Sequence, residues 1–163
     1  MKAVADWWIY GEVDYDHYVR KLKDWGPLIA GILFGAAWWC WADAFVYQRS
    51  VEGESYPFKY NWPGIAASVA LILINSLPKR DLDEAAESGE EGADLRARLW
   101  LLASWLVAFA AVCGSIATLV SCTQAERYVG VGVASVVQCG LILASALLFW
   151  AFRSDEGSAY TYY

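Results

Sequence analysis

The chain has only one histidine, His17, and its four cysteines show no C-x-x-C spacing. A single histidine cannot form a histidine-based metal cluster or a catalytic triad, and such isolated cysteines predict small packing residues instead of a zinc site or a disulfide framework. The chain also lacks a nucleophile–base pair, a phosphate-binding loop and a metal-ligand cluster. We therefore predict a protein that is not an enzyme, with no catalytic residues, no metal and no cofactor, although it could bind lipid.

Charge is also scarce, since charged residues make up 18% of the 163 residues, against about 25% in an average soluble domain. The net charge of −6 and the scattered basic residues argue against nucleic-acid binding. Four long segments contain no Asp, Glu, Lys or Arg, and they hold 18, 19, 27 and 25 residues. These segments are 25–42, 60–78, 99–125 and 128–152. About 20 apolar residues cross a bilayer as a helix, and so small a chain lacks the surface residues to bury four such helices. The sequence thus predicts an all-α integral membrane protein.

We predict a small polytopic bundle of four transmembrane helices. The predicted spans are 27–47, 63–77, 99–121 and 129–152. Pro27 and Pro63 are placed at helix starts, where a missing N–H costs nothing, and Pro78 closes the second span.

The segments outside the spans are an N-terminal segment, an acidic loop and a Tyr-rich tail, at 1–26, 78–98 and 153–163. Apolar residues at helical spacing between Asp14 and Trp25 predict an amphipathic interfacial helix, with a loop of scattered aromatics as the alternative. Seven acidic residues between Asp81 and Asp94 predict a mobile, solvated loop.

Basic residues predict the orientation in the membrane. Nine lysines and arginines lie in the N-terminal segment, the acidic loop and the C-terminal tail. Only three lie in the two loops that join the first span to the second and the third span to the fourth. The excess predicts that both termini and the acidic loop face the cytosol. Tryptophans near the ends of the spans or in the N-terminal segment are expected to be interfacial anchors. These anchors are Trp7, Trp8, Trp25, Trp62, Trp100 and Trp150.

Three strongly polar side chains, Asp43, Asn75 and Gln138, fall within the predicted spans. A carboxylate in a bilayer is costly, so Asp43 is either a structural group, paired with Arg49 or Arg127 and level with Thr118 and Ser121, or part of a proton or ion relay. Asn75 and Gln138 are expected to make interhelical hydrogen bonds.

Small residues at four-residue spacing predict close helix packing, within the chain or against a partner. We expect at least one of these stripes to face another protein. The glycines on which the prediction rests are Gly31, Gly35, Gly64, Gly114 and Gly140.

The run from Gly31 to Ala44, GILFGAAWWCWADA, and the run from Gly64 to Ser76, GIAASVALILINS, resemble the transmembrane protein 50 family. Arg98-Leu-Trp100 is similar to this family as well. The Gly-Val-Gly run that begins at Gly130 and the charged Asp155-Glu156 tail that ends in tyrosines resemble its fungal branch, the vacuolar protein sorting-associated protein 68 type. The resemblance implies a four-span protein of endosomal or vacuolar membranes without catalytic residues. It also implies a partner, a second small four-span membrane protein similar to the leptin-receptor overlapping-transcript product.

Three functions follow as hypotheses. The favoured one is a non-enzymatic membrane protein that binds partners in endosome-to-vacuole or lysosome protein trafficking. The second is an accessory subunit of a large membrane complex, such as a bioenergetic assembly. The third is a small transporter or channel that uses Asp43.

Overall fold

The computed structural model describes residues 15–53, 55–76 and 91–152, and the side chains within 25–53, 55–76 and 95–152. These residues form four α-helices and one short 3-10 helix, and no strand occurs among them, which confirms the all-α prediction. In chain order the elements are α2 (Tyr15–Ser50), η1 (Phe58–Asn61), α3 (Trp62–Ser76), α5 (Glu91–Gln124) and α6 (Val129–Phe152).

Three of the helices are long and apolar enough to cross a membrane, over Trp25–Ser50, Leu95–Gln124 and Val129–Phe152. The fourth, α3, has 15 residues and covers about 22 Å at 1.5 Å per residue. It is strongly apolar but shorter than the about 30 Å hydrocarbon layer of a bilayer. That α3 also spans the membrane therefore stays a prediction.

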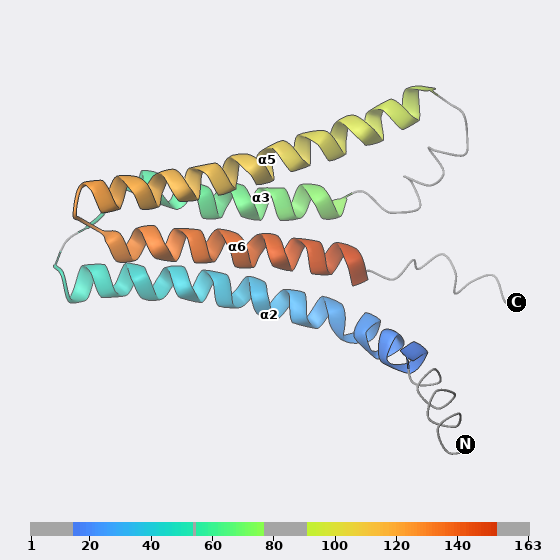
Figure 1. The fold of residues 1–163 in the computed structure, drawn as a ribbon, viewed down its shortest axis with the longest axis horizontal. Coiled ribbons are helices and arrows are strands. Elements are labelled where there is room, and N and C mark those ends of the chain that lie inside the picture. The colour runs from blue at the N-terminus through green and yellow to red at the C-terminus, as the bar shows by residue number, and fades with distance from the viewer. Residues whose placement is uncertain (1–14, 54, 77–90, 153–163) are drawn as a thin grey trace, which may run out of the picture.

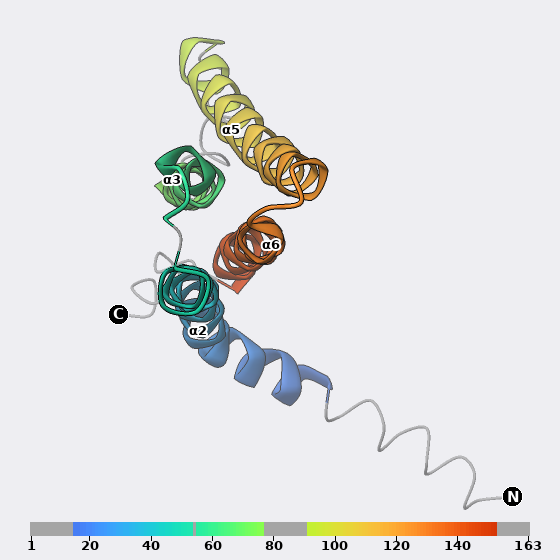
Figure 2. The same ribbon diagram turned by 90° about the vertical axis from the view of Figure 1, so that its left-hand side faces the viewer.

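The four helices lie lengthwise beside one another and alternate in direction (Figure 1). The Tyr15, Ser76, Glu91 and Phe152 helix ends lie at one end of the bundle, and the turn from α5 to α6 lies at the other. Helix α6 contacts all three other helices, and α3 packs against both α5 and α6. Helix α2 packs extensively against only one other helix, α6. Helices α2 and α5 therefore lie on different sides of the bundle (Figure 2).

Helix α2 differs from the prediction at its N-terminal end. It runs without interruption from Tyr15 to Ser50 and carries Pro27 inside it, so Pro27 does not start a helix. The expected interfacial helix and first span are one continuous helix, which bends close to its N-terminal end in Figure 1. An internal proline removes one backbone hydrogen bond and kinks a helix without necessarily ending it.

Helix α5 begins at Glu91, eight residues before the predicted start of the third span. The acidic loop predicted for 78–98 is therefore helical from Glu91 onward. Charged residues stop a membrane span but do not stop a helix, and Ala, Leu, Arg and Glu are among the best helix formers. The prediction of a mobile loop for the preceding acidic residues lies outside the described residues.

Small side chains form the core between the helices. Its central cluster contains Ala37, Ala67, Ala111, Cys139 and Ile142. Ile142 is the largest side chain that is fully buried, whereas many large apolar side chains, such as Trp39 at 77% exposed, point outward. A small-residue interior with a large apolar exterior is the arrangement expected for helices that pack closely within lipid.

Candidate functional site

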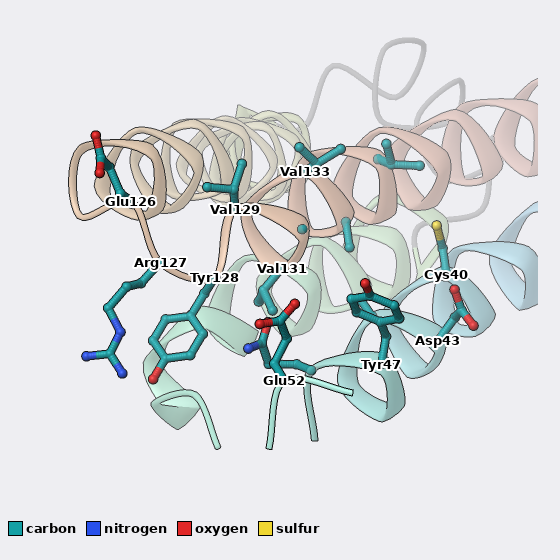
Figure 3. Close-up of a pocket in the computed structure, with 15 residues that line it drawn as sticks. Cys40, Asp43, Tyr47, Glu52, Glu126, Arg127, Tyr128, Val129, Val131 and Val133 are labelled. Carbon is teal, nitrogen blue, oxygen red and sulfur yellow. The ribbon is translucent and has the colours of Figure 1, made fainter. Parts of the chain in front are cut away.

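Asp43 opens onto a cavity of about 660 Å³ between α2, α6 and the α5–α6 turn (Figure 3). On the α2 side the cavity is lined by Cys40, Asp43, Tyr47 and Gln48. These positions follow one another at helical spacing, so one face of α2 forms that wall.

The opposite wall is the first half of α6. Val129, Val133 and Val137 line the cavity at four-residue spacing, and each is exposed on the outside of the bundle. The cavity therefore combines an apolar wall that opens sideways with polar groups on α2 and on the loops.

Acidic groups predominate in the cavity. Asp43, Glu52 and Glu126 line it together with one basic side chain, Arg127. Asp43 and Arg127 lie at opposite ends of the cavity in Figure 3, so the two predicted partners share a site without facing each other. The other predicted partner of Asp43, Arg49, is not among the lining residues.

The residues expected at the depth of Asp43 on the third span do not reach it. Thr118 and Ser121 belong to α5, which does not pack extensively against α2. Thr118 donates its hydroxyl hydrogen bond to the Gly114 carbonyl of its own helix, at 2.9 Å.

The turn that closes the cavity holds two residues in the left-handed region, Glu126 at φ 50° and Tyr128 at φ 61°. Non-glycine residues seldom adopt this conformation. Here the Arg127 N–H donates to the Cys122 carbonyl at 3.2 Å and the Gly132 N–H donates to the Tyr128 carbonyl at 3.1 Å. The first bond lies at the end of α5 and the second at the start of α6. The tight turn between them places Glu126 and Tyr128 in the cavity wall.

The two predicted intramembrane amides both lie between α3 and α6. The Asn75 Nδ2 donates to the Leu71 carbonyl of its own helix at 2.9 Å and to the Ala146 carbonyl of α6 at 3.4 Å. Gln138 is 2% exposed and lies against Gly64, and its Nε2 has no hydrogen-bond partner among the described residues. Asn75 thus makes an interhelical bond, whereas Gln138 packs against a glycine.

Two further bonds between helices involve residues that the sequence did not single out for that role. The Ser145 hydroxyl on α6 donates to the Ala30 carbonyl on α2 at 2.7 Å, in a buried position. The indole N–H of Trp100 on α5 donates to the Leu73 carbonyl on α3 at 3.0 Å. A sequence cannot distinguish such a serine from Ser68, which bonds only to its own helix at the Gly64 carbonyl.

An aromatic layer holds the loop before α3 against α2. The indole N–H of Trp41 and the phenol of Tyr56 both donate to the Asn61 Oδ1, at 2.9 and 3.1 Å. The Phe45 ring lies between those of Trp41 and Tyr56, with centroids 5.7 and 5.8 Å away. Burial raises the pKa of Tyr56, and the hydrogen bonding with Trp41 lowers it by less.

The five predicted packing glycines fall into two groups. A Cβ at Gly64 would collide with the Gln138 side chain, and one at Gly114 would lie 3.5 Å from the Pro63 Cγ. At Gly31, Gly35 and Gly140 nothing lies within 4 Å of that position, so these three face open space in the described structure.

Two glycines that the prediction omitted allow closer contacts. A Cβ at Gly132 would lie 2.9 Å from the Leu119 Cα, and one at Gly26 would collide with Phe152. Gly132 has no small residue four positions away, and Gly26 lies one residue before the predicted first span, which is why the sequence pattern did not single them out.

The predicted anchors Trp25, Trp62, Trp100 and Trp150 are all exposed. Trp62 and Trp150 lie at or near helix ends, and Trp25 and Trp100 lie near the starts of the apolar spans of α2 and α5. These positions suit the membrane interface, although the anchoring role of all four stays a prediction. Trp7 and Trp8 lie outside the described residues.

A model of the uncharacterised protein family UPF0220 matches residues 13–158. The chain is 26% identical over 145 residues to the transmembrane protein 50 homolog of Dictyostelium discoideum, covering 80% of this chain and 91% of that protein. It is 25% identical over 156 residues to vacuolar protein sorting-associated protein 68 of Saccharomyces cerevisiae, covering 84% of this chain and 85% of that protein. No solved structure matches the chain.

Proposed function

The chain belongs to the UPF0220 family, and from that premise we propose that it is a non-enzymatic multi-pass membrane protein that binds partner proteins in endosome-to-vacuole or lysosome trafficking. The observation that carries the proposal is the similarity to vacuolar protein sorting-associated protein 68, which extends over 84% of this chain. The resemblance to the transmembrane protein 50 family that the sequence suggested is confirmed by the curated relatives. The proposed place is the endosomal or vacuolar membrane, with both termini in the cytosol.

One face of α2 is the surface proposed for partner binding. Within its apolar span only 11% of the residues are buried. The exposed side chains of Trp25, Ile32, Trp39 and Val46 recur at seven-residue intervals and therefore lie along one line of the helix. Gly35 lies close to that line by helical geometry and has open space beside it.

Small residues beside exposed aromatic residues let another transmembrane helix approach closely, and close packing drives helix association in lipid. The proposed partner is a second small membrane protein with four spans, similar to the leptin-receptor overlapping-transcript product. The same exposed face supports the second candidate function, an accessory subunit of a larger membrane complex.

The test is purification of the tagged chain from its own membranes in mild detergent, followed by identification of the polypeptides that stay bound. Co-isolation of a small multi-span sorting protein supports the proposal. Stoichiometric co-isolation of respiratory or photosynthetic subunits supports the accessory-subunit alternative and overturns the trafficking proposal.

Two glycine variants make the test specific to the α2 face. Gly35→Leu adds a side chain where the chain itself offers no obstacle, so it should fold normally and lose the partner. Gly140→Leu is the matched control on α6, where the space beside the glycine is also open. Equal recovery of the partner with wild type and Gly35→Leu would overturn the assignment to this face.

A further inference from the structure

We propose that the cavity between α2 and α6 binds a single-chain membrane lipid with a protonated amine headgroup, of the long-chain-base class. The amine would lie beside Gln48, between Asp43 and Glu52 along the α2 wall, and the hydrocarbon chain would follow the valine wall of α6. This inference rests on the cavity alone and does not depend on the proposed role in trafficking.

The charge of the cavity favours a cation. Three carboxylates and one guanidinium line it, which leaves a net charge of −2. Every acidic side chain within the described side-chain ranges, 25–53, 55–76 and 95–152, is among the lining residues. Because opposite charges attract most strongly where water is partly excluded, this concentration favours an ammonium group and opposes a phosphate.

A largely buried residue whose amide faces the cavity supplies an independent indication of a ligand. Gln48 is only 8% exposed, yet it lines the cavity and makes no side-chain hydrogen bond to another described residue. The Gln48 amide is not among the described polar atoms that are fully enclosed without a partner, so it faces the cavity, where a hydrogen-bonding ligand would replace water. The amine and hydroxyl groups of a long-chain base can both bond to it.

The walls of the cavity suit a hydrocarbon chain. Val133 and Val137 are 48% and 42% exposed, so the cavity opens on the apolar outside of the bundle instead of ending within it. From Cys40 to Gln48 the α2 wall extends about 12 Å along the helix axis. The cavity of about 660 Å³ lies within the range of about 300–1,000 Å³ typical of ligand sites, and its position between two helices favours one chain over two.

A metal ion is the other ligand that carboxylates attract. Among the residues that the structure describes, however, no group of three or more His, Cys, Asp or Glu side chains is placed to hold one. The carboxylates are instead distributed along the cavity, as Figure 3 shows for Asp43, Glu52 and Glu126. That spacing suits an extended amphiphile more than a single ion.

The experiment uses the full chain in nanodiscs and a photoactivatable sphingosine as the probe. Unlabelled competitors are sphingosine, N-acetylsphingosine, which has no charge, and palmitate, which is anionic. We expect crosslinks on α2 and α6 that sphingosine displaces at least tenfold more effectively than either other lipid. Equal displacement by N-acetylsphingosine, stronger displacement by palmitate, or no crosslink at all would overturn the proposal.

Variants assign the binding to the cavity. Asp43→Asn should weaken binding about fivefold, and adding Glu52→Gln should weaken it further by a similar factor. Arg98→Gln, near the start of α5 and far from the cavity, should leave affinity unchanged.

A second pair of variants tests the apolar wall without altering charge. Val137→Trp fills the cavity and should prevent crosslinking, whereas Val120→Trp on α5, at a similarly exposed position outside it, should not. Wild-type affinity in both the Asp43→Asn/Glu52→Gln and the Val137→Trp proteins would place any bound lipid elsewhere and overturn the proposal.

Discussion

Gly64 on α3 leaves the space that the side-chain amide of Gln138 on α6 occupies. Gln138 is 2% exposed, and any Cβ at position 64 would collide with its amide group. The two residues come from different predicted spans and were singled out for different reasons, one as a packing glycine and one as an intramembrane polar group. Their contact means that the approach of α3 to α6 depends on the absence of a side chain at one position.

Gly64→Ala should therefore destabilise the protein by up to about 2 kcal/mol, because an overpacking cost of about 1–3 kcal/mol is partly offset by the higher helix propensity of alanine. Alanine has a higher helix propensity than glycine by about 1 kcal/mol, so the matched Gly140→Ala variant, which meets no atoms within 4 Å, should be neutral or stabilising. The free energy of unfolding in mixed micelles measures both changes.

A double-mutant cycle links the effect to Gln138. In a Gln138→Ala background the obstacle is removed, so Gly64→Ala should cost much less there than in wild type. Additive effects of the two changes would show that Gly64 is required for another reason.

Asn61 connects the loop before α3 to α2, because its side-chain oxygen accepts bonds from Trp41 and Tyr56. Trp41→Phe removes one donor and retains an aromatic ring beside Phe45, so we expect a loss of about 0.5–1.5 kcal/mol in stability. Trp39→Phe is the control, since that side chain is 77% exposed. Thermal unfolding of the three proteins in one detergent compares them, and equal loss in both variants would contradict the assigned bond.

Alkaline pH should weaken the same region through Tyr56. Burial raises its pKa above the ordinary tyrosine value of 10.0, so the folded state favours the neutral phenol. The resulting stabilisation is complete below the unfolded pKa and is lost as pH rises through the higher folded pKa. Unfolding measured between about pH 9 and 12 should show this loss in wild type.

The phenylalanine of the Tyr56→Phe variant cannot ionise, so the variant should lack this part of the loss of stability at alkaline pH. It also lacks the hydrogen bond to Asn61 at every pH. Tyrosinate absorbance of the folded proteins gives a direct check, because the difference between wild type and variant should titrate above the ordinary tyrosine range. A difference that titrates in the ordinary range would mean that Tyr56 is not shielded from water.

The sequence predicts well the features that charge alone determines. Helix α6 covers the same residues as the predicted fourth span, because Arg127 and Arg153 bound its charge-free segment on both sides. Helices α2 and α5 start earlier than the predicted spans, since a helix continues beyond the membrane wherever the helix propensity of its residues allows. Helix α2 continues through Pro27, and α5 continues through charged residues.

The cavity around Asp43 is only partly readable from the sequence. The cost of a carboxylate in a span singles out Asp43, but its neighbours depend on which helices pack together. Helix α2 packs on α6 instead of α5, which replaces the expected Thr118 and Ser121 with the valines of α6. The left-handed Glu126 and Tyr128 contribute through a turn that carries no glycine signal.

The length of α3 leads to a prediction about the topology of the whole chain. The helix covers about 22 Å, and the four residues of η1 directly before it add about 8 Å at 2.0 Å per residue. Together they match the about 30 Å hydrocarbon layer, so α3 with η1 should cross the bilayer despite its short length. Four crossings would then place the end of α3 and the start of α5 on the same side of the membrane as the start of α2 and the end of α6, and these four helix ends lie together at one end of the bundle in Figure 1.

Cysteine labelling in sealed vesicles tests the crossing of α3. In a chain whose native cysteines are replaced by serine, Ser88→Cys and Ser158→Cys should react with a membrane-impermeant maleimide from the same side. Glu52→Cys should react only from the other side, because it follows the opposite end of α2. If α3 does not cross, α5 must start on the side of Glu52, and because α5 and α6 together cross twice, Ser88→Cys and Ser158→Cys would both label from the same side as Glu52→Cys. The charge-free segment 60–78 would then be a buried helix, and the chain would have three spans instead of four.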